Sequence, residues 1–229
     1  MALMQRLRRL IRRPLSASTV GTRRPSPSAP RRGDTGHEDA LRAQLTDDPN
    51  NEEAFSALAE IVRRRAAEDP TLEDPLRDSD EIPESRQREA DLAVWALAEE
   101  LAGHPRGWYP LIELGRLSLS DDPEGAVRRF TTAAERDPDG NALVEGLAIL
   151  REAGMPVEAL GLGVGHWRVK EHPPEVGRQL VLAALEADRV HEAKQHLRAL
   201  ETHPDARATA SLREDLAKRI AEAGPATPR

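Results

Sequence analysis

The chain has 229 residues, with 30 arginines against 3 lysines, 40 acidic residues, no cysteine and a formal net charge of -7. The lack of cysteine excludes a disulfide scaffold, a cysteine-ligated metal site and a thiol nucleophile. No apolar run approaches the ~18 residues that a membrane span needs, so we do not expect an integral membrane protein.

The first segment, residues 1–33, is a basic tail. It holds nine arginines and no acid, so its charge is +9 and residues 34–229 carry -7 minus 9, or -16. Residues 1–13 alternate apolar side chains and arginines at helical spacing, which predicts a short basic amphipathic helix. Pro14–Gly33 is rich in serine and proline, and we predict that it is disordered. The residues expected to attach the tail to a target are Leu3, Leu7, Arg8, Arg9, Leu10, Arg12 and Arg13.

Several interpretations of this tail stay open. It could contact an anionic membrane peripherally, because arginines near such a surface and an inserted apolar stripe both favour binding. It could equally bind an acidic partner, serve as an organelle targeting segment, or remain a solvated tail. Arginine outnumbers lysine throughout the chain, as in proteins of GC-rich genomes. We therefore expect a bacterial cytoplasmic protein.

Residues 34–223 are predicted to form a helical repeat domain. Good helix formers dominate, and proline, glycine and Asp-Pro pairs interrupt them every 12 to 18 residues. Ala93, Ala126, Ala159 and Ala193 are 33, 33 and 34 residues apart. A period of this length is typical of a helix–turn–helix unit, which must stack on its neighbours to bury its apolar face. The expected fold class is all-α.

Residues 106–139 resemble a tetratricopeptide repeat (TPR). The family pattern is met by Leu111, Leu114-Gly115, Ala126, Phe130, Ala133 and Pro138. The resemblance implies a right-handed α-solenoid of about four helical hairpins. Its units would span residues 51–105, 106–139, 140–172 and 173–205, with a capping helix over 206–223 and a disordered end at 224–229. In the third unit Gly163 replaces the aromatic residue, which predicts looser packing there.

The first expected unit contains an acidic insertion at residues 67–84. This stretch has eight acids, one arginine and three prolines, which make it a poor helix. A long surface loop costs little stability, so the repeat can tolerate it. Either it is a solvated acidic loop, or it holds the basic tail by charge pairing.

No motif in the sequence predicts catalysis, a metal or a cofactor. His191 and His196 are five residues apart, whereas a helical zinc pair needs a spacing of four. Three glycines at 161, 163 and 165 lack the spacing of a dinucleotide fingerprint and fall inside a predicted helix. There they weaken the helix and allow close approach of another backbone. We therefore expect a protein that is not an enzyme.

The resemblance to TPR proteins implies that the first helices of successive units line a groove for a protein or peptide ligand. The expected groove residues are Tyr109, Ile112, Arg116, Asn141, Val144, Arg151, Arg178 and Leu182. Apolar residues mixed with arginines favour an amphipathic ligand with some negative charge. Nucleic acid is not expected on the acidic repeat domain. The leading hypothesis is a non-catalytic adaptor or scaffold, and the alternative is a membrane-surface tether acting mainly through the basic tail.

Overall fold

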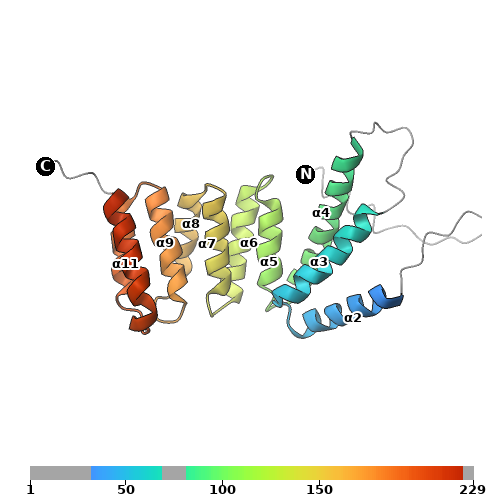
Figure 1. The fold of residues 1–229 in the computed structure, drawn as a ribbon, viewed down its shortest axis with the longest axis horizontal. Coiled ribbons are helices and arrows are strands. Elements are labelled where there is room, and N and C mark those ends of the chain that lie inside the picture. The colour runs from blue at the N-terminus through green and yellow to red at the C-terminus, as the bar shows by residue number, and fades with distance from the viewer. Residues whose placement is uncertain (1–31, 69–80, 224–229) are drawn as a thin grey trace, which may run out of the picture. The chain divides into compact units, whose positions relative to one another are not determined.

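The computed structural model describes residues 32–68 and 81–223, and every regular element within them is an α-helix (Figure 1). The prediction of an all-α fold is confirmed for these residues. None of their helices combines the length and apolar character that crossing a bilayer requires. The ten helices are α2 (Arg32–Asp47), α3 (Glu52–Ala67), α4 (Glu81–Ala102), α5 (Tyr109–Ser118), α6 (Pro123–Arg136), α7 (Asn141–Glu152), α8 (Pro156–His166), α9 (Pro174–Glu186), α10 (Val190–Leu200) and α11 (Ala206–Ala223).

Three of the predicted segments lie wholly or largely outside the described residues. These are the basic tail, including its expected attachment residues, most of the acidic insertion at 67–84, and the end at 224–229. Arg32 and Gly33, which were expected to be disordered, belong to α2. On either side of the insertion, α3 ends at Ala67 and α4 already begins at Glu81. Residues 67–84 were expected not to form a stable helix, but the last four of them are helical.

The helix starts follow from local chemistry. A side-chain oxygen of Asn51 accepts the backbone N–H of Ala54 at 2.9 Å and caps α3. The carboxylate of Asp122 accepts the backbone N–H of Gly125 at 2.8 Å and caps α6 in the same way. Helices α6, α8 and α9 each begin at a proline, which suits the first turn because no N–H is required there.

From α3 onward, each helix packs on helices that are close to it in the sequence. Within the compact unit that begins at Gly36, α3 packs on α4, α5 on α6, α7 on α8 and α9 on α10. Further contacts join helices two places apart, namely α5 with α7, α6 with α8, α7 with α9 and α9 with α11 (Figure 1). Hairpins that pack on their neighbours in this order are consistent with a helical repeat.

Glycines let neighbouring helices interlock. Phe130 on α6 is fully buried, and its ring occupies the place that a Cβ atom at Gly115 on α5 would take. On its other side, a Cβ atom at Gly146 on α7 would lie 3.3 Å from the Phe130 Cβ. One aromatic side chain thus fills the space that two glycines leave on adjacent helices. Close packing of this kind supplies most of the stability of a helical stack.

In the third expected unit, Leu180 fills the space beside Gly163. A Cβ atom at Gly163 on α8 would overlap the side chain of Leu180 on α9 and lie 3.2 Å from Leu147 on α7. Both leucines are fully buried. A leucine from the following helix thus occupies the volume that the missing aromatic ring leaves, whereas Gly161 and Gly165 of α8 face open space. Looser packing of the unit as a whole stays a prediction.

Polar side chains tie together the loops that precede α5, α7, α9 and α11. Arg136 donates through Nη1 to the carbonyl oxygens of Ala102, His104 and Gly107, at 2.8 to 3.1 Å. Further along, the ring of buried His172 packs on Gly140, whose φ of 83° suits glycine. The His203 Nε2 then lies 3.2 Å from the carbonyl oxygen of His172. These contacts fix the spacing of successive hairpins.

The interlock predicts opposite effects for two glycine-to-alanine substitutions. Gly115→Ala would force the Phe130 ring to move and should lower the free energy of unfolding by about 1–3 kcal/mol. Gly161→Ala on α8 enters open space and should raise it by about 0.5–1 kcal/mol, because alanine favours the helix. Urea denaturation followed by circular dichroism at low protein concentration measures both. Equal effects of the two substitutions would contradict the interlock.

Candidate functional site

Polar side chains from α3, α5 and α7 meet on one face of the stack. We call this the carboxylate face and define it by Glu52 of α3, Tyr109, Glu113 and Arg116 of α5, and Glu145 of α7. Their charges act on one another, since Glu52, Glu113 and Glu145 all influence the Tyr109 hydroxyl. These three helices are the first helices of successive expected units, the helices from which the sequence predicted groove residues.

The start of α5 is positioned by Asn50, in the loop between α2 and α3, rather than by a cap of its own. Trp108 offers no capping side chain. Instead, the Asn50 side-chain oxygen accepts the backbone N–H groups of Trp108 and Tyr109, at 2.8 and 3.0 Å. The Asn50 amide nitrogen also donates to the carbonyl oxygen of Arg106 at 2.8 Å. Through these hydrogen bonds, Asn50 fixes the backbone position of Tyr109.

Tyr109 anchors the face in the core. Its ring lies edge-on to Phe55 of α3, with ring centroids 5.4 Å apart, and its hydroxyl shares a hydrogen bond with the Ser56 side chain. Burial, together with the negative charges of Glu113 and Glu52, raises the pKa of Tyr109 to about 12. The hydroxyl therefore stays protonated at neutral pH and serves as a neutral hydrogen-bonding group.

Glu145 and Glu52 share a proton across the face. Burial raises the pKa of Glu145 to about 8, and the hydrogen bond and negative charge of Glu52 add to this effect. With its pKa raised to about 8, Glu145 is mostly protonated at neutral pH and can donate a hydrogen bond to a side-chain oxygen of Glu52.

The charge of Arg116 does not neutralise this pair. Its Nε lies 3.3 Å from a carboxylate oxygen of Glu113 one helical turn away, and its side chain is half exposed. Arg116 lowers the pKa of Glu145, but by less than burial and Glu52 raise it. Three carboxyl groups on this face are thus matched by one guanidinium, which leaves an excess of acid.

The structure separates the predicted groove residues into buried and accessible ones. Ile112 has no exposed surface and Tyr109 is almost fully buried, so neither offers an open apolar contact. Ile112 belongs to the buried hydrophobic core. Asn141 is exposed, and Val144 and Leu182 are half-buried.

The predicted groove arginines are all engaged within the chain. Besides the Arg116–Glu113 pair, Arg151 of α7 donates through Nε to a carboxylate oxygen of Glu186 at 2.9 Å, and it also bonds Gln179. Arg178 of α9 pairs with Glu175 at 2.7 Å. Because these cations already have carboxylate partners, they give little support to the negatively charged ligand that the sequence suggested.

Sequence analysis missed the carboxylates of this face. Glu113 and Glu145 occur 32 residues apart, close to the repeat period, and that spacing was the only signal that could have indicated them. Glu52 was indistinguishable from an ordinary acidic residue in a first helical turn. Their proximity depends on how α3, α5 and α7 stack, which periodicity alone does not specify.

No arrangement suited to metal binding occurs among residues 32–68 and 81–223. His191 interacts with Gln195, with 3.0 Å between the two side-chain nitrogens, and the His196 ring lies edge-on to Trp167. Comparisons with protein-family models, with curated proteins and with solved structures find no match to this chain.

The shared proton predicts a pH-dependent stability. A glutamate whose pKa is raised by folding stabilises the fold at low pH, and this contribution is lost as pH rises from about 4.5 to about 8. Glu145→Gln mimics the protonated form. Relative to the parent protein, this variant should have a higher free energy of unfolding at pH 8 than at pH 5. The change between the two pH values should be on the order of 1 kcal/mol after solvent screening.

Urea denaturation of both proteins across this pH range measures the difference. Glu135→Gln is the matched control, because Glu135 is an exposed acid on α6, away from this face. The assignment of the proton fails if the two variants have the same pH profile relative to the parent protein.

Proposed function

We propose that this chain is a non-catalytic helical-repeat adaptor that binds a protein segment across α3, α5 and α7. The packing order of the helices supports a solenoid of stacked hairpins. We infer that it is TPR-like and right-handed, with about four hairpins and α11 as its cap. Three of the four alanines that defined the repeat period, Ala126, Ala159 and Ala193, are fully buried between helices, whereas Ala93 is partly exposed. A solenoid offers an extended surface made of successive first helices.

The observation that carries the proposal is the proton shared by Glu52 and Glu145. Among the described residues, no cation offsets the burial of Glu145 and the negative charge of Glu52 beside it, so Glu145 keeps its proton. A lysine or arginine side chain of a partner would supply that cation and form charge-assisted hydrogen bonds with both. The face therefore favours a segment with a basic residue, rather than the negatively charged ligand expected from the sequence.

Nearby groups would fix the orientation of such a segment. The half-exposed Arg116 could donate to a carbonyl oxygen or carboxylate of the bound chain, and exposed Asn141 at the start of α7 can both donate and accept. Half-buried Val144 supplies an apolar contact beside them. A central cation, flanking polar contacts and a small apolar contact together describe a short basic peptide motif.

Selection from a phage-displayed library of random linear peptides tests this function. We expect the selected peptides to be enriched in lysine or arginine at one fixed position. Glu145→Gln should weaken their binding about tenfold or more, because it removes one of the two charges that hold the cation. Glu135→Gln should leave binding unchanged. Selected peptides without a basic residue, or binding insensitive to Glu145→Gln, would count against the proposal.

The shared proton also sets the pH dependence of binding. A partner cation favours the ionised form of Glu145, so binding releases a proton. We expect the affinity for a selected peptide to rise between pH 6 and pH 8 and then to level off, as measured by isothermal titration calorimetry. The proton release should disappear in Glu145→Gln. An affinity that falls over this range would mean that the protonated form is the one that binds.

A further inference from the structure

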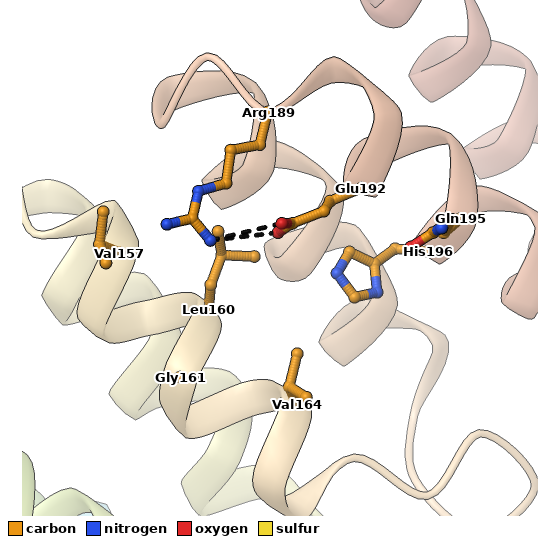
Figure 2. A pocket seen from close by; sticks show the side chains of 8 residues that line it. All are labelled: Val157, Leu160, Gly161, Val164, Arg189, Glu192, Gln195 and His196. Carbon is orange, nitrogen blue, oxygen red and sulfur yellow. Dashed lines mark hydrogen bonds and ion pairs between the residues drawn. The ribbon is translucent and has the colours of Figure 1, made fainter.

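A second surface lies between α8 and α10, on helices that take no part in the carboxylate face. It is a hollow of about 600 Å³ whose lining residues are Val157, Leu160, Gly161, Val164, Arg189, Glu192, Gln195 and His196. Figure 2 shows the valines and Gly161 along α8, facing the polar side chains of α10. Val157 and Val164 are 50% and 66% exposed, and among the described residues only Leu92 of α4 is a comparably exposed large apolar side chain.

The glycines of α8 distinguish this surface from ordinary exposed helix. Gly163 is required internally, because Leu180 fills the space beside it. Gly161 and Gly165 are exposed, and a Cβ atom at either position would have no heavy atom of another residue within 4 Å. Neither glycine has a positive φ. Both weaken the helix with no compensating contact inside the chain. What they provide is a flat strip on which another helix can approach closely.

The strip is complementary to itself. Val157, Gly161 and Val164 lie on one side of α8, four and then three residues apart. An antiparallel copy of α8, related by a two-fold axis between Leu160 and Gly161, places each Val157 against Val164 of the other copy. The flat Gly161 positions then meet near the axis. A two-fold contact requires this kind of self-complementary patch.

The few charges around the hollow fit the same arrangement. Helix α8 carries one carboxylate, Glu158, which is exposed and has no ion pair among the described residues. Because α8 and α10 run in the same direction along the hollow, as Figure 2 shows, the antiparallel copy brings Glu158 to the end lined by Gln195 and His196. Both side chains can donate an N–H to a carboxylate. The remaining charges, Arg189 and Glu192, already pair with each other at 3.4 Å.

We propose that this protein forms a two-fold dimer in which α8 of each copy lies antiparallel to the other, seated in the hollow between α8 and α10. The occupant of the hollow is thus a second copy of this chain. The carboxylate face, on α3, α5 and α7, stays available for a partner. The dimer would present two such faces, and it does not depend on what those faces bind.

Cysteine cross-linking tests the arrangement, because the natural chain has no cysteine to interfere. Under mild oxidation, Gly161→Cys should cross-link with itself. Val157→Cys mixed with Val164→Cys should cross-link far more than either variant alone. In the antiparallel arrangement, Val157 of one copy lies opposite Val164 of the other. The two Val157 residues, or the two Val164 residues, are about 10 Å further apart along the helix, given a rise of about 1.5 Å per residue. That exceeds the reach of a disulfide.

Leu92→Cys is the matched control, since Leu92 is equally exposed but lies on α4. Sedimentation equilibrium of the full chain should show a concentration-dependent dimer, and Val164→Glu should weaken it more than tenfold while leaving the helical circular dichroism spectrum unchanged. A monomer at every concentration would overturn the proposal. So would self-cross-linking of Val164→Cys as strong as that of the mixture, or equal cross-linking of Leu92→Cys.

Discussion

The structure depends on the close fit of large side chains from one helix against glycines of the next. A single helical hairpin of about 30 residues exposes too much apolar surface to be stable alone, so each pair must bury its face on a neighbour. Phe130 between Gly115 and Gly146, and Leu180 on Gly163, are the contacts that achieve this here. Because glycine allows the helix backbones to approach, these contacts set the distance between successive helices.

That distance brings the first helices close enough for their polar side chains to interact. Glu52 and Glu145 belong to α3 and α7, with α5 between them in the chain, yet they share a hydrogen bond. The polar contacts of the intervening loops hold this geometry, since Asn50 positions the start of α5 and Arg136 fixes the loop before it. Packing in the core thus determines the chemistry of the surface.

The sequence predicted the fold well and the site poorly, for a physical reason. Helix starts depend on local chemistry, so Asp122 before Pro123 could be recognised without any tertiary information. The repeat period also survives in the sequence because buried alanines recur at fixed intervals. Side-chain partners across helices leave no such trace. Ile112 therefore seemed accessible although it is fully buried, and Glu145 went unnoticed.

The order of contacts along the chain has a consequence for how the protein is made. Each main helix contact joins elements one or two places apart, so a hairpin needs only its predecessor to complete its packing. During synthesis the N-terminal helices can settle before the C-terminal ones have left the ribosome. Helix α11 then arrives last and buries Leu216 and Ile220 on a surface that already exists. Assembly in this order needs few long-range contacts, which favours fast folding.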